Sequence, residues 1–143
     1  TTVEADVVVV GIGVVPNTDW LKGSGLHLDD GVVCDEACLA ISGDDRVVAV
    51  GDVARWDHPR YGSTRIEHWT NAGEQAAHAA KALVHGREAV GGFAPVPYFW
   101  SDQFGMKLQF VGACRTDDAR GCYWRKRCWR PGLAPRLIAS WHH

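Results

Sequence analysis

The chain has 143 residues, of which 46% are apolar, and its formal net charge is −2. This length and apolar content suffice for one domain with a core, while the near-neutral charge argues against a protein dedicated to nucleic acid or to a membrane surface. Because there is no run of about 18 apolar residues, no signal peptide and an odd count of five cysteines, we expect no membrane span and a reducing, cytoplasmic setting.

The first predicted element is a strand at residues 5–11. Its four consecutive valines are typical of a strand buried on both faces of a parallel sheet. Because no methionine or earlier element precedes this strand, we expect the sequence to begin inside a domain. The strand leads into Gly11-Ile12-Gly13, which lacks the third glycine of a dinucleotide fingerprint, and Pro16 opposes the helix that a phosphate cradle needs. Two interpretations stay open: a plain turn, or a ligand-contacting loop at the carboxyl edge of the sheet.

A second apolar strand is predicted at residues 46–51, and it ends at Asp52. Before it, Asp29-Asp30-Gly31 predicts a tight hairpin turn between two short apolar segments. A carboxylate at the end of a buried strand needs a partner. Asp52 could accept hydrogen bonds from the hydroxyls of a sugar or sugar alcohol, or it could cap the next turn by bonding nearby backbone N–H groups.

A helix is predicted from Asn71 to Val84. Asn71 and Glu74 have the spacing of a capping box, and Gly86 is a natural stop. The buried face is expected to consist of small apolar residues, namely Ala72, Ala76, Ala79, Ala80 and Leu83. The free N–H groups at the start of this helix could stabilise an anionic or electron-rich ligand, although packing against a sheet is the simpler interpretation.

Beyond the helix, residues 98–100 and 107–112 have the pattern of strands in a second, smaller unit. The cysteines before residue 114 are predicted to be inert. If Cys34 and Cys38 share one strand, their positions lie about 13 Å apart, which is too far for a disulfide.

The composition changes near residue 114. Residues 1–114 carry 8 Lys or Arg against 15 Asp or Glu, whereas residues 115–143 carry 7 against 2 and show no strand-like alternation. We interpret this tail as a replaced C-terminus or as sequence translated in a shifted reading frame. Its thiols and imidazoles could make a zinc site only with unfamiliar spacings (Cys114, Cys122, Cys128, His142 and His143), and the two histidines could belong to an expression tag. We therefore assign no metal ligands.

Several of these segments resemble one family. Residues 5–18 are similar to the segment that closes the NAD domain of FAD-dependent pyridine nucleotide oxidoreductases, and residues 51–54 (GDVA) resemble their second flavin motif. Residues 66–72 (IEHWTNA) and 96–103 (VPYFWSDQ) resemble the ferredoxin reductase and rubredoxin reductase branch. The resemblance covers about residues 3–112 and implies an α/β fold, α+β at the C-terminus. It implies a partial FAD/NAD(P)-binding Rossmann-like domain followed by the start of a small reductase C-terminal domain.

The resemblance also implies roles for residues. Asp52 would bind the ribityl chain of FAD, and the backbone around Trp69 would face the pyrimidine edge of the flavin. Trp100 would lie beside the isoalloxazine ring, near the point where electrons leave. Glu67 would lie near the nicotinamide of NAD(P)H, which would be approached by Gly11, Ile12 and Gly13. No side chain is implied as an acid or base, so no catalytic residue is assigned.

By resemblance, the protein would pass electrons from NAD(P)H through FAD to a ferredoxin or rubredoxin that serves an oxygenase. Residues 1–20 would close the NAD domain, 21–92 would belong to the FAD domain, 93–114 would begin the C-terminal domain, and 115–143 would form an atypical tail. The glycine-rich motifs that bind the two dinucleotides in this family do not occur in the sequence. The alternative is therefore a non-catalytic remnant or interaction module that cannot bind FAD. A different acceptor, as in NADH oxidases or the flavin subunits of nitrite reductases, is disfavoured by residues 98–103.

Overall fold

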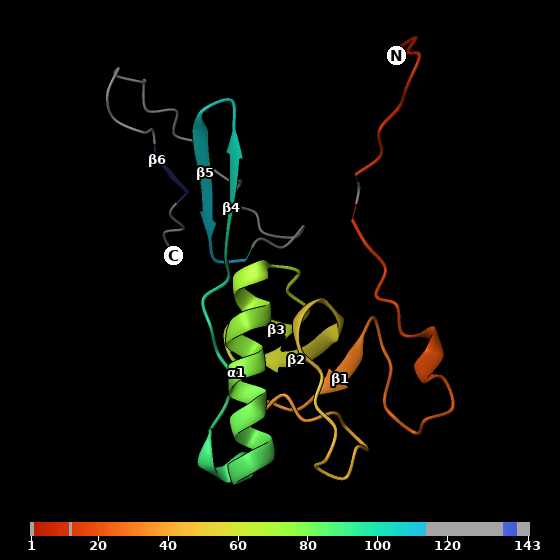
Figure 1. Cartoon of the computed structure of the whole chain (residues 1–143), viewed down its shortest axis with the longest axis vertical. Coiled ribbons are helices and arrows are strands. Elements are labelled where there is room, and N and C mark those ends of the chain that lie inside the picture. Colours follow the sequence, from red (N-terminus) through yellow and green to blue (C-terminus); the bar gives the residue numbers. More distant parts are fainter. Residues whose placement is uncertain (1, 12, 114–135, 140–143) are drawn as a thin grey trace.

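The structure is a computed structural model that describes residues 2–11, 13–113 and 136–139. Its first sheet contains β1 (Val32–Cys34), β2 (Ala54–His58) and β3 (Gly62–Thr64) in that order, with β1 parallel and β3 antiparallel to β2. Helix α1 (Trp69–His85) packs across this sheet (Figure 1). The second sheet contains β4 (Tyr98–Gln103), β5 (Met106–Val111) and β6 (Arg136–Ala139). Short 3-10 helices lie at Asp19–Leu21, Gly51–Val53 and Arg87–Ala89. This mixture of helix and small sheets confirms the predicted α/β class.

The core lies between β2 and α1. Trp56 on β2 is 1% exposed, and its indole Nε1 donates a hydrogen bond of 3.1 Å to the carbonyl oxygen of Phe93. The two aromatic rings are 5.6 Å apart. Ala54 on β2 and Ala79 on α1 belong to the same buried cluster, so small side chains allow the helix to approach the sheet closely.

Helix α1 begins two residues earlier than predicted, and the predicted capping box is wrong. His68 is the N-cap residue and its side chain caps no backbone N–H. Asn71 lies inside the first turn, where its Nδ2 donates to the carbonyl oxygen of Ile66 at 3.2 Å. The end of the helix is confirmed: Gly86, at φ 85°, donates its N–H to the Ala82 carbonyl oxygen at 2.9 Å.

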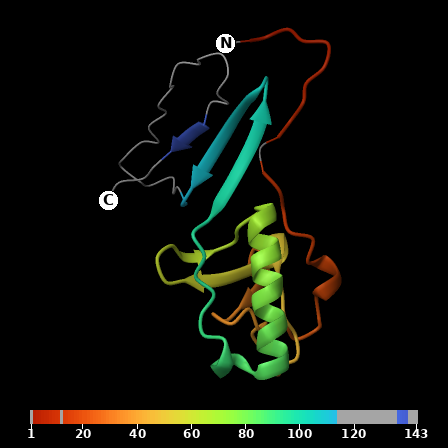
Figure 2. The same ribbon diagram turned by 60° about the vertical axis from the view of Figure 1, so that its left-hand side comes forward.

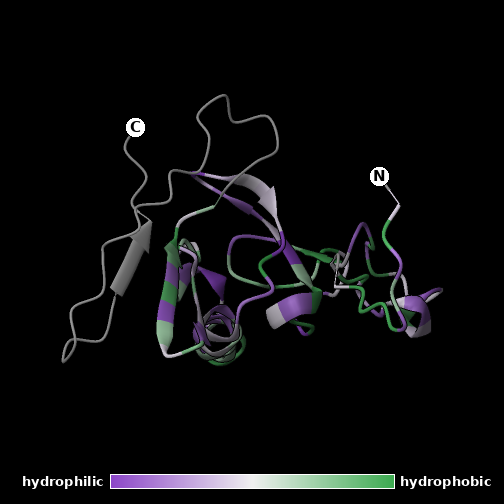
Figure 3. Cartoon of the chain, turned by 90° about the horizontal axis from the view of Figure 1, so that it is seen from above, coloured by the Kyte–Doolittle hydropathy of each residue, from purple (hydrophilic) through white to green (hydrophobic). Residues whose placement is uncertain are grey.

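The predicted alanine face is correct only in part, since Ala79 is buried and Ala72 is half-buried. The buried residues of α1 include two amides, because the buried stripe consists of Asn71, Gln75, Ala79 and Ala82. Ala76, Ala80 and Leu83 are exposed. In Figure 3, where α1 is viewed nearly end-on, the helix carries purple as well as green residues. Polar side chains thus face the sheet, where their hydrogen bonds hold neighbouring segments.

The structure does not contain the two predicted N-terminal strands. Residues 7–10 are 69–91% exposed, and they lie in an extended segment that stands apart from the sheet (Figure 1). A β-branched run needs a neighbouring strand to accept its backbone hydrogen bonds, and no segment among the described residues pairs with it. Residues 46–51 make a single bridge, between Val48 and Leu39. The positive φ of Gly51, 70°, turns the backbone, and the regular strand β2 begins only after Asp52.

The turn at residues 29–31 is confirmed, although only one bridge, Leu28 to Val32, follows from it. Gly31 has a φ of 128°, and a Cβ there would lie 2.6 Å from the carbonyl oxygen of Val53. Only glycine permits this close approach. The turn is therefore pressed against the segment that carries Asp52.

Cys34 and Cys38 do not share a strand: Cys34 ends β1, and Cys38 follows in a turn at φ 68°. Both are buried free thiols. Burial raises the pKa of Cys34 to about 11 and that of Cys38 to about 12. Because the thiolate is the reactive form, the two side chains are unreactive at neutral pH, as predicted.

The second unit is a hairpin that rises from the start of α1 (Figure 2). β4 and β5 pair antiparallel over residues 98–111, which confirms both predicted strands. Thr70 on α1 donates its hydroxyl to the Tyr98 carbonyl oxygen at 2.8 Å and so fixes β4 to the helix start. The tail contains a strand that the sequence did not predict, since β6 pairs parallel with β5. Among the described residues no helix is long and apolar enough to cross a membrane.

Candidate functional site

A pocket of about 400 Å³ lies where the hairpin meets the start of α1, and it is lined by Glu67, His68, Trp69, Phe99 and Trp100. The indole rings of Trp69 and Trp100 meet edge to face, with centroids 6.2 Å apart and planes at 86°. Trp69 is 83% exposed, and Trp100 is 37% exposed. The fold thus brings three of the predicted site residues together from two separate stretches of sequence.

Aromatic neighbours fix the walls of this pocket. The ring of Tyr98 stacks on Trp100 with centroids 5.8 Å apart, and its hydroxyl accepts a hydrogen bond of 2.6 Å from Gln109 Nε2. On the other side, the rings of His68 and Phe99 are 5.3 Å apart. Planar walls of this kind suit a flat, conjugated ligand.

The start of α1 supplies hydrogen-bond donors to the same region. The first intrahelical bond runs from the Ala72 N–H to the His68 carbonyl oxygen, so the N–H groups of Trp69, Thr70 and Asn71 have no acceptor within the helix. Burial lowers the pKa of His68, against opposing contributions from Glu67 and Asp52, so that its imidazole is neutral at pH 7. Its Nδ1 is buried without a hydrogen-bond partner in the described part of the chain. Free donors and the positive end of the helix dipole favour an electron-rich ligand edge at this point.

Asp52 lies beside this helix start. A Cβ on the preceding residue, Gly51, would lie 3.2 Å from the Cβ of Ala72 in the first turn of α1. The N–H of Gly51 donates to Gln75 Oε1 at 2.8 Å, which ties the two segments together. Asp52 is exposed, and within the described residues its carboxylate makes no hydrogen bond to a backbone N–H. The turn-cap interpretation of Asp52 is therefore wrong.

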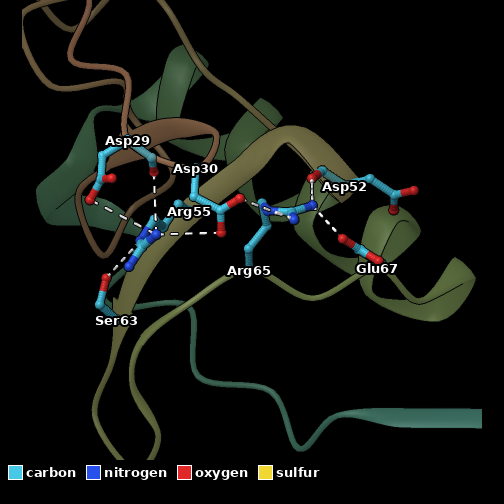
Figure 4. A network of polar contacts seen from close by, with 7 residues as sticks. All are labelled: Asp29, Asp30, Asp52, Arg55, Ser63, Arg65 and Glu67. Carbon is cyan, nitrogen blue, oxygen red and sulfur yellow. Dashed lines mark hydrogen bonds and ion pairs between the residues drawn. The ribbon is translucent and has the colours of Figure 1, made fainter. Parts of the chain in front are cut away.

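A network of charged side chains supports this corner (Figure 4). Arg65 contacts Asp30, Glu67 and the backbone of Asp52. Sequence reasoning assigned no role to Arg65, His68 or Phe99. Their position in the sequence could have indicated them, because they lie in or next to the stretches that carry the family resemblance. Arg65 immediately precedes residues 66–72, His68 lies within them, and Phe99 lies within residues 96–103.

The predicted nicotinamide loop is not part of this corner. Gly11 and Gly13 are exposed in the extended N-terminal segment, and a Cβ added to either would meet no atom within 4 Å. Ile12 lies outside the described residues, as do the candidate zinc ligands of the tail. The structure therefore assembles Asp52, Glu67, Trp69 and Trp100 and leaves the loop apart from them.

A family described as "Pyridine nucleotide-disulphide oxidoreductase" matches residues 1–76 of this chain. The chain is 39% identical over 128 residues to the anthranilate 1,2-dioxygenase system ferredoxin–NAD(+) reductase component of Burkholderia cepacia. The matched region is 83% of this chain and 30% of that protein.

Solved structures with the same local fold come from similar proteins. Fdr9 matches with a TM-score of 0.73 and 45% identity over 87% of this chain and 32% of its own. The ferredoxin reductase of the CYP199A2 system from Rhodopseudomonas palustris matches with a TM-score of 0.70 and 33% identity, over 85% of this chain and 29% of its own. Putidaredoxin reductase, in its covalent complex with putidaredoxin, matches with a TM-score of 0.68 and 35% identity, over 86% and 28%. The chain thus spans about 30% of the length of each of these relatives.

Proposed function

Because this chain belongs to the pyridine nucleotide-disulphide oxidoreductase family, we propose that it serves in a reductase component that passes electrons from NAD(P)H through FAD to a ferredoxin or rubredoxin. The observation that carries the proposal is the pocket formed jointly by residues 66–72 and 96–103, with two indoles and a helix N-terminus at its walls. The relatives named above are ferredoxin reductases and a reductase joined to its redox partner.

The residues of this corner fit a flavin. The neutral His68, its buried unpartnered Nδ1 and the free N–H groups of α1 suit the electron-rich pyrimidine edge of the ring. The Asp52 carboxylate would accept hydrogen bonds from the ribityl hydroxyls, and Trp100 would lie on the side where electrons leave. When bound, FAD would supply the step from hydride to single-electron transfer. The contribution of these side chains is to orient the rings, with Glu67 near the nicotinamide.

The proposal keeps the predicted layout as its frame. Residues 1–20 would close the NAD domain and bring Gly11, Ile12 and Gly13 to the nicotinamide, residues 21–92 would belong to the FAD domain, and residues 93–114 would begin the C-terminal domain. The grip on the pyrophosphate of FAD would come from a glycine-rich helix start, which this sequence does not contain.

The experiment is an FAD titration of the apoprotein of a full-length reductase that carries this segment together with its glycine-rich motifs, comparing the native protein with Asp52→Ala. Loss of charge-assisted hydrogen bonds, each about 1.5–3 kcal/mol, should weaken FAD binding by about tenfold or more per bond. Asp57→Ala is the matched control, because Asp57 is an exposed carboxylate on β2 outside this corner. Equal FAD affinity of the native protein and Asp52→Ala would contradict the role of Asp52.

The alternative is a module that cannot bind FAD, which the relatives named above do not favour. Visible absorbance of the purified native protein separates the two. Flavin bands support the reductase, whereas a colourless protein that stays colourless after incubation with FAD supports the module.

A further inference from the structure

We propose that Arg65 is a positioning residue for the flavin site, one that holds the backbone of Asp52 and the carboxylate of Glu67 in a fixed relation while leaving the Asp52 carboxylate free for ligand. This inference rests on the proposed function and adds to it a residue that touches no ligand itself.

The guanidinium of Arg65 joins three segments. Its Nη1 donates to the Asp52 backbone carbonyl oxygen at 2.8 Å and lies 2.5 Å from Glu67 Oε1. Its Nη2 lies 3.3 Å from Asp30 Oδ1. The planar, forked group of arginine can meet several acceptors at once in fixed directions, which an ammonium group cannot do. One side chain therefore sets the spacing between the two residues proposed to face the ribityl chain and the nicotinamide.

Arg65 contacts the backbone of Asp52 and not its side chain. In Figure 4 the Asp52 carboxylate points away from the guanidinium, and the dashed line from Arg65 ends on the main-chain oxygen. An ion pair with the carboxylate would have occupied the lone pairs that a sugar hydroxyl needs. Bonding the carbonyl instead fixes the position of the residue and preserves its charge for binding.

Burial makes this arrangement rigid. The side chain of Arg65 is 9% exposed, so its charge must be balanced by neighbours. Asp30, in the turn at residues 29–31, and Glu67 supply that balance. The turn is close to Arg65 because residue 31 is glycine: a Cβ at Gly31 would lie 3.1 Å from Arg65 Cδ. The acidic turn thus holds the guanidinium of Arg65 in place, and Arg65 in turn holds the backbone of Asp52 and the carboxylate of Glu67.

Arg55 provides a control within the same network. It contacts Asp29 and Asp30 of the same turn, at 3.9 and 3.4 Å, and Ser63 at 3.1 Å. No contact joins it to Asp52 or Glu67 in the described structure (Figure 4). Loss of either arginine disturbs the acidic turn, but only loss of Arg65 releases the two proposed site residues.

The test compares Arg65→Gln, Arg65→Lys and Arg55→Gln in the native protein. For each, FAD affinity is measured by titration of the apoprotein, and the environment of the bound ring by the visible circular dichroism of the flavin. Arg65→Gln should weaken FAD binding on the order of tenfold, the effect of one misplaced charge-assisted hydrogen bond, and should change the dichroism. Arg65→Lys keeps the buried charge and the fold but should restore the affinity only in part. Arg55→Gln should leave affinity and dichroism close to those of the native protein.

Equal losses in Arg65→Gln and Arg55→Gln would overturn the inference, because both would then act only by supporting the turn. Full restoration by lysine would overturn it as well, since charge alone would suffice. In either case a native protein that binds FAD leaves the proposed function standing. A native protein that binds no FAD would overturn the proposed function and this inference together.

Discussion

Replacing Gln75 by methionine should loosen the contact between α1 and the segment that carries Asp52. Gln75 is fully buried, and its Oε1 is the acceptor for the Gly51 N–H at 2.8 Å. Methionine has similar length but no comparable acceptor, so the buried N–H would lose its partner. Leaving a buried donor unsatisfied costs about 1–3 kcal/mol, which corresponds to a fall of about 5- to 150-fold in the equilibrium constant for closing this contact.

Amide hydrogen exchange at Gly51 measures this change directly, since local opening controls the exchange of a buried amide. The exchange of Gly51 should accelerate by a factor within that range in Gln75→Met. Glu74→Gln is the control, because Glu74 is the exposed neighbour on the same helix turn. Unchanged Gly51 exchange in Gln75→Met would refute the assignment of this hydrogen bond as the link between the two segments.

Two further predictions concern the pocket. Burial lowers the pKa of His68 below its usual 6.5, so the unfolded chain takes up the proton first as the pH falls. The stability that His68 contributes is therefore present above pH 6.5 and is lost below it. The thermal unfolding midpoints at pH 7.5 and 5.5 should differ more in the native protein than in His68→Gln. Identical pH dependence in both would count against a lowered pKa of the half-buried His68 imidazole. If the proposed function holds, Trp100→Ala should slow electron transfer to the proposed iron–sulfur partner more than reduction by NAD(P)H, because the ring is proposed to lie on the exit side. Stopped-flow traces with both half-reactions slowed equally would exclude that placement.

Local patterns in the sequence predicted the elements that depend on local chemistry. The hairpin strands at β4 and β5, the turn before Gly31 and the stop at Gly86 all follow from residues whose conformational preferences act within a few positions. The resemblance implied that Trp69 and Trp100 each lie near the flavin, and neither it nor any local pattern predicted that the two rings meet. The Thr70 to Tyr98 hydrogen bond that joins β4 to the helix start cannot be found from composition or spacing.

The predictions that were wrong share a physical cause: tertiary contacts decide which secondary structure and which burial a local sequence pattern adopts. Residues 7–10 have strong strand propensity, yet no described segment pairs with them. The sequence pattern predicted Asn71 as a helix cap and did not include Gln75 in the predicted face. They are buried because Ile66 and Gly51 supply their hydrogen-bond partners. The role proposed for Arg65 was invisible for the same reason, since its acceptors come from three segments.

The connection between the two units, residues 93–97, contains two prolines and no regular element, yet hydrogen bonds hold it at three points. Trp56 bonds the carbonyl oxygen of Phe93, His58 Nε2 lies 2.9 Å from that of Pro95, and the Gly112 N–H donates to that of Pro97 at 2.7 Å. A chimaera that grafts the hairpin of a relative onto this chain with a junction inside the connection would replace residues whose main-chain carbonyl oxygens accept these bonds. The junction for such an exchange belongs after Tyr98, because the native connection is then kept and still sets the direction of the incoming strand.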